Sequence, residues 1–145
     1  MIFRAVCVTL AIALGATAVV AQSAAIAERK ALMKSVGAAA KTGAGFMKGT
    51  TPYDNAKAVE VFATFASVAA KMPALFPDDS KTGGETTASP KIWDDKAGFT
   101  AAMAKFEAEA KAAQASVKDL DTFKAAFATT GKLCGSCHET FRTGN

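Results

Sequence analysis

The sequence predicts an all-α protein, a four-helix bundle, on the strength of two observations. Four segments of about 16 to 25 residues each carry apolar residues at spacings of three, four and seven, which places them on one face of a helix. No segment shows the period-two alternation of β-branched and polar residues that is typical of a strand. With 145 residues, half of them hydrophobic, the chain is long enough for one domain around a single core.

The first two helices are predicted from their apolar stripes and their ends. Gly49 and Pro52 end the first helix, whose stripe consists of Ile26, Met33, Val36, Ala40, Gly43 and Met47. Asp54 is the expected N-cap of the second helix, and Pro73 and Pro77 close it. The inner face of this second helix is predicted to carry Val59, Phe62, Phe65, Ala69 and Met72.

The third and fourth helices are also predicted from their caps and apolar stripes. Asp94 or Asp95 caps the third helix, whose stripe is Phe99, Met103, Phe106, Ala110, Ala113 and Val117. Asp119 caps the fourth, and Gly144 lies beyond its end. Its stripe is Leu120, Phe123, Phe127, Thr130, Cys134, Cys137 and Phe141. Four such helices predict a bundle.

One connection is long for a bundle. The 17 residues "PDDSKTGGETTASPKIW" link the second and third helices and are rich in Gly, Ser, Thr and Asp. We expect residues 78–86 to be a flexible crossover. Ile92 and Trp93 are large apolar residues directly before a helix, so we expect them to pack inward and pin that end of the connection.

The N-terminus has the pattern of a secretory signal peptide. Arg4 supplies the positive region, an apolar run follows, and Val19 and Ala21 are the small residues that precede cleavage. We expect residues 1–21 to be removed, with residues 22–145 forming the domain in the periplasm, free of the membrane. The alternative is an uncleaved membrane anchor, because the apolar run is nearly long enough to span a bilayer. A net charge of +4 from scattered residues argues against a nucleic-acid partner.

The stretch "KLCGSCHETFR" holds the only histidine and the two cysteines outside the predicted signal peptide. A redox dithiol of the thioredoxin kind belongs at a helix N-terminus, and structural zinc needs four ligands. A disulfide between Cys134 and Cys137 would close a very small loop and leave His138 unexplained. Cys-x-x-Cys-His is the signature of covalent c-type haem attachment. On a helix the three side chains share one face, so two thiols could hold one haem c while His138 reaches its iron.

With that motif in the last helix, the chain resembles the cytochromes c′, the class II c-type cytochromes. Five patches carry the resemblance, from about residue 24 to 143: "ERKALM", "KGTTPYD", "MPALFP", "SPKIW" and "GKLCGSCHETFR". The resemblance implies an antiparallel up-down-up-down four-helix bundle with one covalently bound haem c.

The resemblance also implies roles for individual residues. Arg29 falls where the family has an arginine that bonds a haem propionate, followed by Lys30, and Met33 covers the distal face of the iron. Arg142 matches a basic residue beside the proximal histidine, although a partner for the helix dipole is an alternative. Thr87 and Ser89 match loop positions near the propionates; relatives often have a longer basic residue in place of Ser89.

Two functions remain open at this point. One is a periplasmic electron carrier that uses the Fe(III)/Fe(II) couple and docks weakly on redox partner proteins. The other is a binder of NO or CO at an empty sixth position. We expect Met33 to contact the distal face without ligating the iron, and no enzyme activity, because the distal stripe lacks an acid or base. The resemblance also implies a homodimer packed through the first two helices, although exposed alanines suit a monomer equally.

Overall fold

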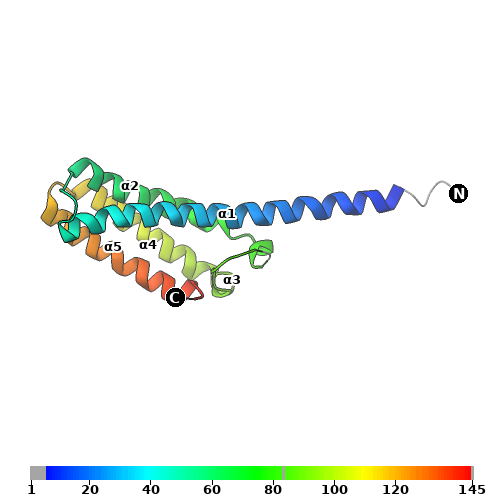
Figure 1. Ribbon diagram of the computed structural model, residues 1–145. Coiled ribbons are helices and arrows are strands. Elements are labelled where there is room, and N and C mark those ends of the chain that lie inside the picture. Colours follow the sequence, from blue (N-terminus) through cyan, green and yellow to red (C-terminus); the bar gives the residue numbers. More distant parts are fainter. Residues whose placement is uncertain (1–5, 83, 145) are drawn as a thin grey trace.

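The fold is the predicted all-α bundle. The computed structural model describes residues 6–82 and 84–144, and their side chains from residue 24 onward. Within this part of the chain, four long helices make up the bundle: α1 (Val6–Lys48), α2 (Asn55–Lys71), α4 (Lys96–Ser116) and α5 (Leu120–Phe141). Three short elements lie between α2 and α4, namely η1 (Met72–Leu75), η2 (Asp78–Ser80) and α3 (Lys91–Asp94). In Figure 1 the N-terminal part of α1 extends well beyond the other helices.

The helix ends were largely predictable. Gly49 follows α1 with a φ of 68°, a left-handed conformation that glycine adopts without strain. Asp54, Asp95 and Asp119 are the N-caps of α2, α4 and α5, and each accepts a hydrogen bond from a backbone N–H of the first turn. The second helix ends earlier than Pro73 suggests, because α2 tightens into the 3₁₀ turn η1 at Met72.

The core consists of two neighbouring clusters. The first is built on aromatic rings in edge-on and tilted contact; it includes Phe46, Phe62, Phe65 and Phe123. The second contains Val68, Met72, Ile92, Trp93, Phe99, Met103 and Phe141. The predicted inward packing of Ile92 and Trp93 is confirmed, since both are buried.

The predicted apolar stripe of α1 was partly wrong. Met47 is exposed, and its neighbour Phe46 is the residue that enters the core. Met33 is exposed too, but it lines the cavity described below together with Val36 and Ala40, so it does lie on the predicted stripe. Beyond Gly43, the position that faces the core is therefore reached after three residues rather than four, as the 3.6-residue turn allows.

Helices α1 and α5 approach each other closely at one end of the bundle only. At Gly43 the ring of Phe127 occupies the place that a side chain would take, so only glycine fits. Toward its C-terminal end α5 diverges from α1 (Figure 1). This divergence leaves room for a cavity at the end of the bundle where α3 lies.

The crossover, which runs from η1 to α3, is anchored at both ends; the flexibility expected for residues 78–86 does not hold for residues 78–80, which form η2. It begins with η2, whose Ser80 is fully buried. Ala88 and Arg142 form an isolated antiparallel bridge, and the N–H of Thr143 donates to the carbonyl of Thr87 at 2.8 Å. The crossover is thereby fastened to the end of α5.

Candidate functional site

A cavity of about 640 Å³ lies where α1 and α5 diverge. Its volume falls within the range of about 300–1,000 Å³ that is usual for small-molecule and cofactor sites. All four long helices, η1, α3 and the crossover contribute to its wall. The wall is largely apolar, and its buried part includes Val68, Met72, Ile92, Phe99, Met103 and Phe106. A largely apolar group with a few polar substituents would suit this lining.

The motif residues of α5 all line this cavity. Cys134, Cys137 and His138 are separated by three and one positions, so one face of the helix presents them together. Both cysteines are half-buried free thiols, which leaves their sulfur atoms available for bonding to a ligand. The structure thus brings together the three residues that the sequence singled out.

The protonation of these groups follows from their burial. Loss of solvent raises the pKa of the Cys134 and Cys137 thiols, so both are protonated near neutral pH. Burial lowers the pKa of His138, and the positive charge of Arg142 lowers it further. A neutral imidazole has a free nitrogen lone pair, which is the form that binds a metal ion.

The wall formed by α1 contains Met33, Val36, Gly37 and Ala40. These residues and the motif of α5 border the same cavity from two different helices. Met33 lines the cavity, and its distal role stays a prediction. Among the described residues that line the cavity there is no aspartate or glutamate.

Arg29 is the most unusual polar residue of the wall, because it is a cation with only 5% of its surface exposed. Its Nη1 donates to the carbonyl of Leu75 and to Oγ of Ser80, and its Nη2 donates to the carbonyl of Ser80, each at 3.2 Å. The guanidinium also lies 4.4 Å from the ring centre of Phe76 and 5.7 Å from that of Trp93. Burial lowers the pKa of Arg29.

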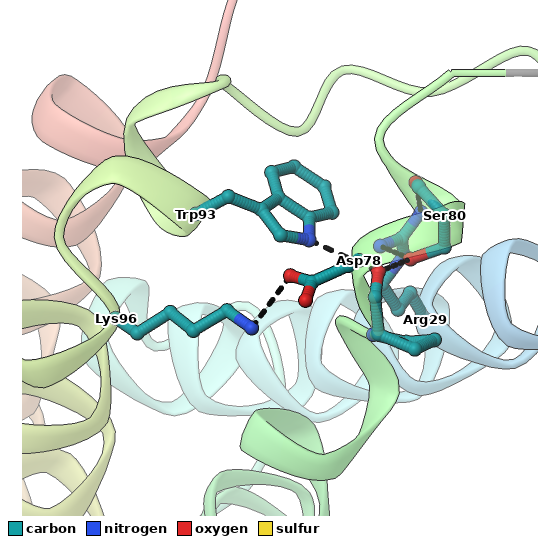
Figure 2. Close-up of polar contacts among 6 residues, drawn as sticks. Arg29, Asp78, Ser80, Trp93 and Lys96 are labelled. Carbon is teal, nitrogen blue, oxygen red and sulfur yellow. Dashed lines mark hydrogen bonds and ion pairs between the residues drawn. The ribbon is translucent and has the colours of Figure 1, made fainter.

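Figure 2 shows how these contacts join the crossover to three helices. Trp93 donates from its indole N–H to the carbonyl of Pro77 at 3.0 Å, and Lys96 pairs with Asp78 at 2.7 Å. Within the described residues no carboxylate pairs with Arg29. A buried positive charge that meets only neutral oxygens is costly, and an anionic group in the adjoining cavity would compensate it.

Exposed basic residues surround the mouth of the cavity. Lys30, Lys34 and Arg142 line it, as does Thr87. The Nζ of Lys30 lies 3.8 Å from Oε2 of Glu85, a long contact between two solvated side chains that contributes little stability. Ser89 is not part of the wall; its N–H donates to the carbonyl of Phe141 at 3.0 Å, which holds the crossover against α5.

Sequence reasoning missed some residues of the wall. Lys34 and Gly37 line the cavity from α1, and Thr86 and Phe76 line it from the connection that follows α2. Lys34 could have been found, since it follows Lys30 by four residues and lies on the same helical face. Phe76 carries no such signal, because its position depends on how η1 turns.

The arrangement defines a class of protein. A four-helix bundle whose last helix presents Cys-x-x-Cys-His to an apolar cavity, bordered by a buried arginine, has the parts required to bind a c-type haem. The two thiols would form the covalent bonds to the haem, His138 would ligate its iron, and Arg29 would face its propionate carboxylates.

Comparison with known proteins agrees with this class. The family model for cytochrome c′ matches residues 24–142. The cytochrome c′ of Rhodopseudomonas palustris is 46% identical over 131 residues, which cover 90% of each chain. A cytochrome c-556 of the same organism is 38% identical over 143 residues, or 96% of each chain. A solved structure of R. palustris cytochrome c′ superposes with a TM-score of 0.80 at 45% identity, covering 83% of this chain and 97% of that one.

The chain therefore belongs to the cytochrome c′ family. It is a class II c-type cytochrome, and the proteins of this family bind covalent haem c. Its relatives are cytochromes rather than classical enzymes.

Proposed function

We propose that the protein is a periplasmic electron carrier. The observation that carries the proposal is the position of His138, which lines the cavity and is exposed at its basic mouth. When bound, the haem supplies an iron that takes up and releases one electron. A haem bound through the exposed His138 would be able to exchange electrons with a partner that docks at this mouth.

The charge around the mouth indicates the kind of partner. Lys30, Lys34 and Arg142 are exposed there, and Arg29 is buried behind them. Such a surface attracts an acidic protein by long-range electrostatics and releases it quickly, which suits brief encounters between redox partners. Acidic periplasmic redox proteins are therefore the proposed partners.

The proposal includes export and the absence of catalysis. Removal of residues 1–21 would release residues 22–145 into the periplasm, and N-terminal sequencing of protein from a periplasmic extract tests this. The part of the wall next to Met33 has Val36 and Gly37 beside the exposed Lys34, and it has no carboxylate that could act as a general acid or base.

A double substitution tests the attachment of the cofactor. Cys134→Ala with Cys137→Ala removes both thiols, so haem staining of the denatured protein is expected to disappear. Cys134→Ala alone should retain a weaker stain through the remaining thioether bond. Equal staining of the double variant and the wild type would refute covalent attachment at this motif.

Electron transfer itself is tested by kinetics at varied salt concentration. With an acidic redox protein as oxidant, Lys30→Gln with Lys34→Gln should lower the bimolecular rate and flatten its dependence on ionic strength. Lys118→Gln is the matched control, because Lys118 is exposed on the turn between α4 and α5 and does not line the cavity. A rate independent of salt in the wild type would contradict the proposed docking.

Binding of NO or CO is a second candidate function. The observation in its favour is the α1 wall, where Met33 is exposed and its neighbours Val36, Gly37 and Ala40 are small or apolar. We propose that Met33 contacts the distal face and leaves the sixth iron position open. The ferric absorption spectrum tests this. A sulfur-to-iron charge-transfer band at the red edge of the visible, lost in Met33→Ala, would show ligation by Met33 and exclude an open position.

We also propose a homodimer that packs through the first two helices. Of the small residues of α1, Ala38 is exposed, whereas Gly43 packs against Phe127 inside the bundle. Sedimentation velocity at micromolar concentration should give a species of twice the chain mass, and a single monomeric species would refute the proposal.

A further inference from the structure

Ser80 is the residue of the crossover that holds the buried cation of the cavity wall. It is fully buried in η2 and does not itself line the cavity. Two of the three hydrogen bonds that Arg29 makes within the described residues end on Ser80: Nη1 donates to its Oγ and Nη2 donates to its carbonyl, both at 3.2 Å. The third ends on the carbonyl of Leu75. Figure 2 shows the guanidinium beside Ser80.

The hydroxyl of Ser80 is itself held in place. It donates its hydrogen to the carbonyl of Pro77 at 2.9 Å, and the backbone N–H of Ser80 donates to the same carbonyl at 3.0 Å. The indole N–H of Trp93 donates there as well, at 3.0 Å. Because the hydroxyl hydrogen is used in this way, Oγ presents a lone pair to Arg29 and acts as an acceptor. Ser80 therefore offers Arg29 an acceptor of fixed position.

The contacts of Arg29 leave one part of its guanidinium available to a ligand. A guanidinium has five N–H donors in one plane. Leu75 and Ser80 take up both donors of Nη1 and one donor of Nη2, and the guanidinium carbon lies 4.4 Å from the ring centre of Phe76. In the described part of the chain, the donors left over are the Nε–H and one N–H of Nη2. Two donors on neighbouring nitrogens match the two oxygens of one carboxylate.

The fixed position matters because the effect of a charge depends on its distance from the group on which it acts. An arginine side chain has many rotamers, and holding it in one of them costs conformational entropy. Acceptors that are already in place hold the guanidinium before a ligand arrives, which lowers the cost of binding. Arg29 lines the cavity, so a carboxylate inside the cavity meets a cation whose orientation is already set.

We propose that Ser80 is a positioning residue of the haem site: it fixes Arg29 so that the guanidinium holds a haem propionate through two hydrogen bonds. Its positive charge then stays next to the haem. A cation in this place disfavours the more positive Fe(III) state and raises the reduction potential. This role rests on the first candidate function, the electron carrier, because it sets the potential at which the carrier works.

Reduction potentials of the haem-loaded protein test this role. They would be measured by spectroelectrochemical titration at about pH 8, where a carboxyl group with an ordinary pKa of about 4 is ionised. Arg29→Met removes the cation and should lower the potential. Ser80→Ala removes the hydroxyl but keeps the carbonyl, so it should lower the potential by a smaller amount. In the Arg29→Met background, Ser80→Ala should cause no further shift, because a residue that acts through Arg29 has no effect once Arg29 is replaced.

Resonance Raman spectroscopy gives a second readout, at the propionates themselves. The bending vibration of a haem propionate changes frequency with the hydrogen bonds that the carboxylate accepts. Ser80→Ala should therefore move this band in the same direction as Arg29→Met does. A change in the stability of the crossover alone would not move it.

Thr130→Val is the matched control. Thr130 is almost as buried as Ser80, with 1% of its surface exposed, and its hydroxyl donates to the carbonyls of Ala126 and Phe127 within α5, both at 3.1 Å. The variant removes one buried hydroxyl, as Ser80→Ala does, at a position that does not line the cavity. Its reduction potential and its propionate band should equal those of the wild type.

The outcomes separate positioning from a structural role. An unchanged potential in Ser80→Ala would overturn the proposal and leave Ser80 as an anchor of the crossover. An equal shift in the Arg29→Met background, or in Thr130→Val, would overturn it too, because the effect would then not pass through Arg29. The comparison of Ser80→Ala with Thr130→Val decides the proposal even if Arg29→Met takes up no haem.

The same measurements also separate this proposal from the function on which it rests. The reduction potential is an equilibrium property that is measured without a partner protein. If the wild type exchanged no electrons with an acidic redox protein, the electron carrier would be refuted, whereas the potentials would still decide whether Ser80 positions Arg29.

Discussion

The close approach of α1 and α5 at Gly43 gives a prediction whose sign can be worked out from the structure. In Gly43→Ala the new Cβ atom would lie 2.7 Å from Cζ and 2.9 Å from Cδ2 of Phe127, well inside van der Waals contact. The ring cannot move aside easily, because it stacks against Phe123 at 5.2 Å and against Phe65 at 6.4 Å between ring centres.

Two effects of opposite sign decide the magnitude. Overpacking of a core typically reduces the free energy of unfolding by about 1–3 kcal/mol. Replacing a helical glycine by alanine stabilises the helix by about 1 kcal/mol. The gain offsets part of the cost, so we expect Gly43→Ala to lower the free energy of unfolding by up to about 2 kcal/mol. The matched control is Gly131→Ala, at an exposed glycine of α5 that does not line the cavity and whose added Cβ atom would meet nothing within 4 Å; it should raise the free energy of unfolding by up to about 1 kcal/mol.

The assay is urea unfolding of the haem-loaded protein, followed by circular dichroism, with both variants compared to the wild type. The helix propensity gained is the same in the two variants, so the difference between them isolates the contact with Phe127. If Gly43→Ala were as stable as Gly131→Ala, the close approach of α1 and α5 would be incorrect.

Two further predictions concern polar contacts. Arg29→Met removes three hydrogen bonds to Leu75 and Ser80 and leaves the buried carbonyl of Ser80 without its donor. The free energy of unfolding, measured with urea, should therefore fall by about 1–3 kcal/mol. An unchanged value would refute the role of Arg29 as an anchor of the crossover. Hydrogen bonds from Thr122 lower the pKa of Asp119, so this carboxylate stabilises the protein above its ordinary pKa and loses that effect as pH falls through the lowered value. The urea midpoint of Asp119→Asn should therefore converge on that of the wild type on acidification, and a constant difference would contradict the assignment.

Much of the fold was predictable because its signals are local. The N-caps Asp54 and Asp119 act on backbone groups two or three residues away, and Gly49 ends α1 through its own φ angle. The choice between Phe46 and Met47 was not local. It depends on how α1 is rotated against its neighbours. Phe46 is the residue that enters the core, because its ring packs edge-on against those of Tyr53 and Phe123.

Some features of the candidate site were likewise predictable from local sequence, and others were not. Cys134, Cys137 and His138 were found from their spacing, since one turn of helix is enough to bring them to one face. The crossover was harder to predict, because Ser80 and Trp93 are ordered by contacts with residues far away in the chain.

The sequence by itself determined the helices, their caps, the apolar stripes and the motif, because each depends on interactions within a turn or two of one helix. Only the tertiary structure decided where α1 and α5 separate to form the cavity, and that Arg29 is buried at its wall among neutral oxygens. The exposure of Met33 beside Gly37 was decided there too. These features depend on how far apart two helices lie, and that distance is set by side chains such as Phe127 that pack between them.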